Sequence, residues 1–132
     1  MPMGGRETGG LANTLAAHID FQDQIGRSAV ADFWQTDNLA RKPGLKAVEM
    51  FDAVKSGQIK ALWIMSTNPA VSMPHLHEVE SALSACPFVV VSDVVTSSAS
   101  NIYADVLLPA SAWGEKNGTV TNSERRISRQ RA

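Results

Sequence analysis

The stretch Lys60-Ala-Leu-Trp-Ile-Met-Ser66 decides the fold class of this chain. It is a continuous apolar run with the length of a buried strand, and Thr67-Asn68-Pro69 ends it. Two similar runs follow: residues 88–91, which are rich in β-branched side chains, and residues 105–108, which Pro109 closes. We therefore expect three short strands that lie in the core.

Amphipathic helices are expected between these strands. After Pro74, apolar residues recur at helical spacing until Pro87 ends the pattern. These residues are Leu76, Val79, Leu83 and Cys86. A shorter helical stretch is expected over residues 98–103. Strands that alternate with helices pair in parallel, so we expect an α/β fold with a three-layer, Rossmann-like parallel sheet flanked by helices.

The residues before the first strand are expected to be helical in three places. One helix is expected from Leu11, a short one through residues 30–34, and another after Pro43 that Gly57 ends. The residues after Gly114 are polar and have no strong period, so we expect a loop or a tail there.

The composition is that of an ordinary globular domain. The chain has 132 residues, 44% of them hydrophobic and 19% charged, with a net charge of −1, which argues against disorder. A charge so balanced predicts neither nucleic acid nor a membrane surface as a partner. No apolar run approaches the roughly 20 residues of a membrane helix, and we expect a cytoplasmic location.

Cysteine and histidine usage limits the possible metal chemistry. Cys86 is the only cysteine, which excludes an internal disulfide and a four-cysteine zinc or iron–sulfur site within this chain. His75 and His77 are two residues apart, so on a helix they point to different faces. We expect no metal ligands among these residues.

Polar residues at the strand ends are the candidate binding residues. Ligands of open α/β sheets bind beyond the carboxyl ends of the strands. Asn68 follows the first strand, Ser92 and Asp93 follow the second, and Lys116 lies beyond the third. A carboxylate there can accept hydrogen bonds from a purine or a ribose, and a lysine can neutralise phosphate. The alternative is structural: Asn68 in a turn and Asp93 as a helix cap.

Two arginine-containing segments are further candidates for anion binding. Arg6 lies between the pairs Gly4-Gly5 and Gly9-Gly10, where flexible backbone lets a cation approach an anion closely. Four arginines occupy the last eight residues, without an acid among them. Ordinary solvated surface arginines are the alternative in both places.

Five blocks of sequence, in this order, carry a resemblance to a known family. They are residues 4–13, residues 60–73, residues 90–93, residues 104–109 and residues 113–126. Together they resemble the molybdopterin oxidoreductase family, and within it the catalytic subunits of prokaryotic assimilatory nitrate reductases. The last block, Trp113-Gly-Glu-Lys-Asn-Gly-Thr-Val-Thr-Asn-Ser-Glu-Arg-Arg126, is long and specific.

The resemblance implies a cofactor and a role for each candidate residue. The cofactor is bis(molybdopterin guanine dinucleotide) molybdenum, and the reaction is the reduction of nitrate to nitrite. By motif position, Asn68, Ser92, Asp93 and Lys116 are similar to cofactor contacts, with Asp93 on the guanine or ribose. Arg6 is similar to an arginine that attracts nitrate near molybdenum.

The resemblance also implies that this chain is an internal part of a larger multidomain enzyme. Residues 1–57 would be a loop and helical segment, residues 58–113 the α/β core that binds molybdopterin guanine dinucleotide, and residues 114–132 a cofactor-contacting loop with a truncated basic end. The family's 4Fe-4S ligands and its molybdenum-ligating cysteine lie outside the matched region. Expected partners are nitrate, the remaining domains of the subunit and an electron donor, and the chain alone is expected to be inactive.

Two alternatives differ from a nitrate reductase. The first is a formate dehydrogenase-like catalytic subunit of the same family. The second is a stand-alone α/β module for nucleotide binding or for protein interaction. The glycine pairs match neither GxGxxG nor a phosphate-binding loop, which counts against the second alternative.

Overall fold

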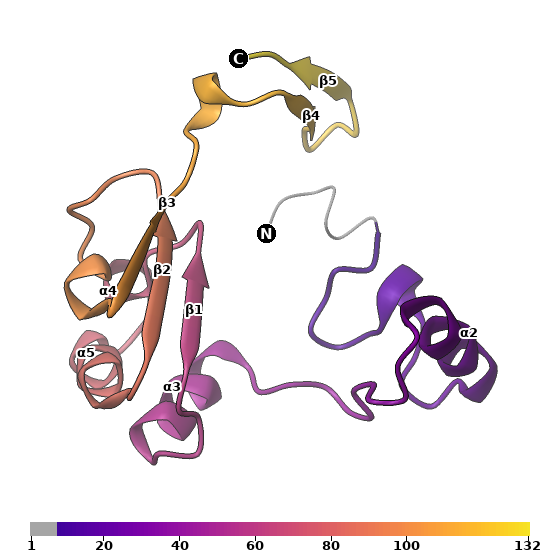
Figure 1. Ribbon diagram of the computed structural model, residues 1–132, viewed down its shortest axis with the longest axis horizontal. Coiled ribbons are helices and arrows are strands. Elements are labelled where there is room, and N and C mark those ends of the chain that lie inside the picture. Colours follow the sequence, from indigo (N-terminus) through magenta and orange to yellow (C-terminus); the bar gives the residue numbers. More distant parts are fainter. Residues whose placement is uncertain (1–7) are drawn as a thin grey trace. The chain divides into compact units, whose positions relative to one another are not determined.

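The computed structural model describes residues 8–132, which fall into two units. One unit is Leu45–Lys116, and the other combines residues 8–44 with residues 117–132. Figure 1 shows the elements of both units, and each unit is described by itself below.

The unit Leu45–Lys116 alternates helices and strands. Its elements are α3 (Ala47–Lys55), β1 (Leu62–Met65), α4 (Pro69–Ser72), α5 (Leu76–Ala85), β2 (Val89–Asp93), η2 (Asn101–Tyr103), β3 (Val106–Pro109) and η3 (Trp113–Glu115). The strands form one parallel sheet in the order β1-β2-β3. The prediction of a parallel α/β fold with three short strands is thus confirmed. The short helix α4 was not expected.

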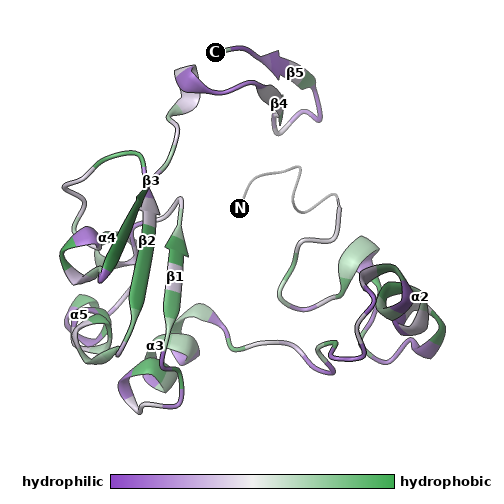
Figure 2. Ribbon diagram, viewed as in Figure 1, coloured by the Kyte–Doolittle hydropathy of each residue, from purple (hydrophilic) through white to green (hydrophobic). Residues whose placement is uncertain are grey.

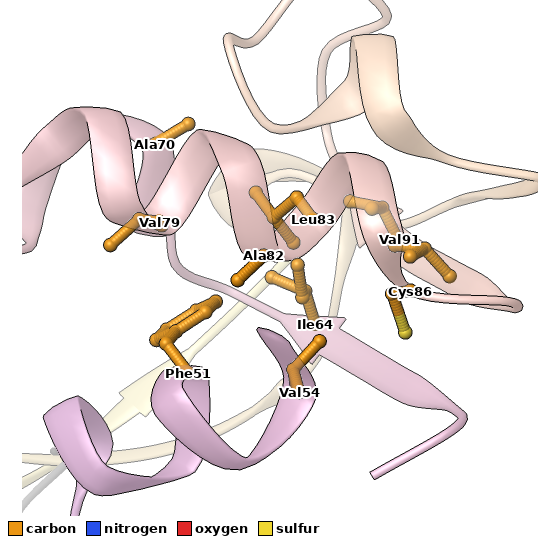
Figure 3. Packing of buried hydrophobic residues seen from close by; sticks show 10 residues of the cluster. Phe51, Val54, Ile64, Ala70, Val79, Ala82, Leu83, Cys86 and Val91 are labelled. Carbon is orange, nitrogen blue, oxygen red and sulfur yellow. The ribbon is translucent and has the colours of Figure 1, made fainter. Parts of the chain in front are cut away.

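The core of this unit lies between one face of the sheet and helices α3, α4 and α5 (Figure 3). Ile64 of β1 pairs in register with Val91 of β2, so both side chains point to the same face. The other buried members of the cluster are Phe51, Val54, Ala70, Val79, Ala82, Leu83, Cys86 and Val89. In Figure 2 the ribbons of β1 and β2 are largely green, the colour of hydrophobic residues.

The other face of the sheet is apolar and open. Trp63 is 60% exposed, and Val90, Val106 and Leu108 line a groove of about 460 Å³ beside it. The strands follow one another across the sheet in chain order, and right-handed crossovers then place every connection on the same side. For this reason the helices of residues Leu45–Lys116 cover one face of the sheet. The expected three-layer arrangement has helices on both faces, and the helical layer of the second face does not come from these residues.

The predicted helices of the first half are only partly correct. Helix α2 (Gln24–Trp34) is longer than expected, because Asp23 caps it by accepting hydrogen bonds from the backbone N–H groups of Ile25 and Gly26. Helix α3 ends before Gly57, as predicted, and Gly57 has a positive φ of 77°. It begins at Ala47 rather than near Pro43.

The helix expected from Leu11 is wrong. The segment contains only one 3₁₀ turn, η1 (Ala16–His18). The spacing of its apolar residues predicts one helical face, but Ala17 and His18 both have positive φ values, which a right-handed helix excludes. The N–H of Leu15 bonds to the carbonyl of Ile19, so the chain reverses there instead of continuing.

The loop or tail expected after Gly114 is also wrong, because residues 118–130 form an antiparallel hairpin. Its strands are β4 (Gly118–Thr121) and β5 (Ile127–Gln130). The side chain of Asn122 accepts a hydrogen bond from the N–H of Arg126 at 2.9 Å, which closes the connection. β-branched Thr119, Val120 and Thr121 favour a strand, but only pairing with β5 stabilises it.

Replacing Gly9 with alanine is expected to destabilise residues 8–19. Gly9 has a φ of +81°, and an added Cβ would lie 2.4 Å from the backbone N of His18. We expect the amides of Leu15 and Ala17, both hydrogen-bonded here, to exchange hydrogen about fivefold to a hundredfold faster, from about 1–3 kcal/mol of strain. Gly44→Ala is the matched control, since nothing lies within 4 Å of its added Cβ. Equal exchange in both variants would refute the expectation.

Candidate functional site

The carboxyl ends of the three parallel strands meet at one edge of the sheet. The N–H of Ser66 bonds to the carbonyl of Ser92, and the N–H of Ala110 bonds to the carbonyl of Asp93 at 2.9 Å. These bonds join the segments that leave β1 and β3 to the end of β2. The structure therefore brings Asn68, Ser92 and Asp93 to one edge, as the strand pattern predicts.

The turn after β1 is held in an uncommon conformation. Ser66 has a φ of 56°, in the left-handed region that side chains other than glycine rarely adopt. The turn leads directly to Asn68, and Pro69 then begins α4. Uncommon backbone of this kind is concentrated at binding and catalytic sites, which supports a binding role for this edge.

Asn68 is half-buried and bonded to the connection between β2 and β3. Its Oδ1 accepts hydrogen bonds from the hydroxyl of Ser100 at 2.7 Å and from the backbone N–H of Ser100 at 3.2 Å. The hydroxyl of Ser100 in turn accepts from the N–H of Ala70 at 3.2 Å. The amide of Asn68 thus ties the end of β1 to a segment about 30 residues away.

Asp93 forms a local turn and remains a carboxylate suited to a ligand. Its Oδ1 accepts hydrogen bonds from the N–H of Val94 at 2.7 Å and of Val95 at 3.3 Å. The nearby Ser98 hydroxyl, followed by these two N–H groups, lowers the pKa of Asp93 below its usual range. The Oγ of Ser98 forms no hydrogen bond with residues 8–132. Its effect on the pKa of Asp93 therefore comes from the nearness of the hydroxyl to the carboxylate. Asp93 ends β2, and the next helical turn, η2, has Ser100 rather than Asp93 as its N-cap, so the helix cap of the structural alternative is not formed.

The side chain of Ser92 lies on the open face of the sheet. Its hydroxyl accepts a hydrogen bond from the indole Nε1 of Trp63 at 3.0 Å. Because side chains alternate along β2, Ser92 and Asp93 point to opposite faces. Their neighbouring positions in the sequence predict one shared binding site, but the structure places their side chains on opposite faces of the sheet.

Lys116 is not bonded to this cluster, and Arg6 lies outside the part of the chain that the structure describes. Lys116 follows η3, is exposed, and makes no hydrogen bond or ion pair with any of residues 8–132. Arg6 lies outside the described residues, so its predicted role in substrate binding stays a prediction.

Sequence reasoning missed two polar residues beside the strand ends. The Oγ of Ser98 and the Oδ1 of Asn101 are buried atoms without a hydrogen-bond partner among residues 8–132, while the Nδ2 of Asn101 donates to the carbonyl of Val95 at 2.8 Å. A buried polar atom without a partner indicates a missing ligand or water. The signal in the sequence is the mostly polar run of residues 96–101, which begins three residues after β2 ends at Asp93.

The chemistry of this edge fits a nucleotide. An ionised carboxylate can accept from the N–H groups of guanine or from a ribose diol, and an amide N–H₂ can donate to phosphate or carbonyl oxygen. Metal ligation is a different matter: within the described part of the chain, no three His, Cys, Asp or Glu side chains come together. A carboxylate and an amide are groups that suit the hydrogen-bonding edges of a nucleotide.

The molybdopterin oxidoreductase family model matches residues 3–132. The chain belongs to the molybdopterin oxidoreductase family. This chain is 56% identical over 131 residues to a nitrate reductase of Klebsiella oxytoca, covering 98% of this chain and 15% of that protein. It is 57% identical over 129 residues to a nitrate reductase of Shewanella frigidimarina, covering 98% and 14%. An F420-dependent formate dehydrogenase subunit alpha of Methanocaldococcus jannaschii is 41% identical over 125 residues, covering 94% and 18%.

Membership of the molybdopterin oxidoreductase family implies a molybdenum–pterin cofactor and redox chemistry. It also argues against a stand-alone nucleotide-binding or interaction module. The chain spans about 15% of the length of the Klebsiella relative. No helix within residues 8–132 is long and apolar enough to cross a membrane.

Proposed function

We propose that this chain is the nucleotide-binding part of a molybdenum-dependent enzyme that reduces nitrate to nitrite in nitrate assimilation. The observation that carries the proposal is the edge formed by Asn68 and Asp93 in a chain 56–57% identical to nitrate reductases. The lower identity of 41% to a formate dehydrogenase subunit makes formate oxidation the second candidate.

The cofactor in this proposal is bis(molybdopterin guanine dinucleotide), one of whose guanine nucleotides binds at the strand ends. Asp93 would accept hydrogen bonds from the guanine or ribose edge, and Asn68 would donate to an oxygen of the nucleotide. Ser92 and Lys116 are further proposed contacts, Lys116 to an anionic part of the cofactor. When bound, molybdenum supplies the two-electron redox chemistry that turns nitrate into nitrite and water.

Substrate and electrons come from outside the described residues in this proposal. Arg6 would attract and orient the nitrate anion through its permanent positive charge. A 4Fe-4S cluster and an electron-donor protein or domain would deliver electrons, and their binding residues belong to other parts of a cytoplasmic enzyme. The single Cys86, buried against the core, cannot supply those ligands.

A chimera tests the proposed function. This chain would replace the matched 131 residues of the Klebsiella oxytoca relative. We expect the chimera to reduce nitrate with an artificial electron donor at a rate within about tenfold of its parent, and the 132-residue chain alone to be inactive. Formate oxidation without nitrate reduction would favour the second candidate. A chimera that folds and contains molybdenum, yet converts neither substrate, would contradict the proposal.

A further inference from the structure

We propose that Ser100 is a positioning residue for nucleotide binding, which orients the side-chain amide of Asn68 so that its Nδ2 faces the ligand. This inference rests on the proposed function, because it assigns the donor that meets an oxygen of the guanine nucleotide. That oxygen is a hydrogen-bond acceptor and belongs either to the phosphate or to the base.

Ser100 is buried, with a side chain that is 0% exposed. Its hydroxyl gives its one proton to the Oδ1 of Asn68 at 2.7 Å and accepts from the N–H of Ala70 at 3.2 Å. The backbone N–H of Ser100 donates to the same Oδ1 at 3.2 Å. The hydroxyl therefore has one orientation that satisfies all of its partners.

This network settles which end of the Asn68 amide faces outward. An Asn side chain can normally be turned by 180°, but a backbone N–H can donate only to the oxygen. Oδ1 must therefore face Ser100, and Nδ2 must face the opposite way. Nδ2 makes no hydrogen bond with the described residues, so both of its N–H groups are available to an acceptor at the edge of the sheet.

Loss of the Ser100 hydroxyl would release this orientation. Oδ1 would retain only the longer backbone contact, and the N–H of Ala70 would lose its acceptor in a buried place. The amide would then populate orientations in which Nδ2 does not meet the ligand. Binding would weaken even though Ser100 itself contacts no ligand.

Guanosine monophosphate (GMP) is the probe, titrated into the ¹⁵N-labelled 132-residue chain and followed by NMR after circular dichroism has shown cooperative unfolding of this chain. If the chain does not fold alone, the same variants are compared in the chimera by guanine nucleotide content per protein, and an unchanged content in Ser100→Ala would overturn the inference. We expect the side-chain N–H₂ signals of Asn68 to shift on addition of GMP, together with the backbone signals of residues 92–95. Guanosine, which lacks the phosphate, distinguishes the two sources of the acceptor: a shift of the Asn68 signals by both compounds places the acceptor on the nucleoside, and a shift by GMP alone places it on the phosphate.

A double-mutant cycle separates positioning from general stability. We expect Ser100→Ala to weaken GMP binding about fivefold to tenfold, and Ser100→Thr, which keeps the hydroxyl, to restore it. In an Asn68→Ala background the same Ser100→Ala change should have no further effect. Equal weakening in both backgrounds would overturn the inference, because Ser100 would then act without Asn68.

The wild-type titration keeps the inference testable if Ser100→Ala fails to fold. Shifts at residues 92–95 without any shift of the Asn68 side-chain amide would overturn this inference and leave the proposed function standing. The absence of shifts at both places would instead count against the nucleotide site itself, and against this inference with it.

Discussion

The substitution Asp93→Asn is expected to weaken GMP binding by about tenfold to a hundredfold, the cost of losing a hydrogen bond to a charged group, about 1.5–3 kcal/mol. If Asp93 meets the guanine rather than the ribose, its ionised carboxylate would accept from two N–H donors of the base, whereas an amide presents one oxygen and a mismatched N–H₂. Wild-type chain should also prefer GMP to AMP, since adenine lacks these paired donors. Asp93→Asn should abolish this preference. NMR titration or calorimetry of the 132-residue chain measures both effects.

Asparagine is the informative replacement because it keeps the local structure. Its Oδ1 can still accept from the N–H groups of Val94 and Val95, which Oδ1 of Asp93 does here. The matched control is Asp52→Asn, an exposed aspartate on α3, which should change neither affinity nor preference. In the chimera, Asp93→Asn should likewise lower the guanine nucleotide content per protein. Unchanged affinity and unchanged content would remove Asp93 from the site.

The substitution Leu83→Ala is expected to lower the free energy of unfolding by about 2–5 kcal/mol, through lost burial and the cavity left behind. Leu83 is 1% exposed and belongs to the buried cluster of Figure 3, which also contains Ile64 of the sheet and Val54 of α3. Because the total stability of a domain is about 5–15 kcal/mol, this one change would remove a large share of it. Denaturant unfolding followed by circular dichroism measures the effect.

Leu76→Ala is the matched control for this prediction. Leu76 begins the same helix but is 39% exposed, so the same change should cost less than about 1 kcal/mol. Equal losses in the two variants would show that α5 does not pack on the sheet as described. A loss at Leu83 alone confirms that the α5 face carries the core.

The parallel sheet could be predicted because its signals are local. Residues 60–66 and 88–91 are apolar runs of strand length, and the spacing of Val79 and Leu83 fits a helix packed on one face. Pro69 and Pro87 mark the ends of elements. Each of these segments has a preference that agrees with its final surroundings, so pattern and structure coincide.

The segments that were predicted wrongly depend on contacts with residues elsewhere. The hairpin of β4 and β5 has weak apolar periodicity, and its strands are stabilised by pairing with each other. In the segment after Leu11, the chain reverses at Ala17 and His18, and their backbone lies close to Gly9. Gly9 allows this close approach because it has no Cβ. The three β-branched residues 119–121 favour a strand but do not identify its partner, and nothing in the sequence next to Ala17 and His18 marks the reversal.

The candidate site divides in the same way. The positions of Asn68 and Asp93 at strand ends follow from the order of apolar runs, since parallel strands end at one edge of a sheet. That Ser100 holds the amide of Asn68 does not follow from it, because the two residues are brought together only when the chain returns from β2 to β3. A side-chain hydrogen bond depends on distances of a few tenths of an ångström, and only tertiary packing sets those.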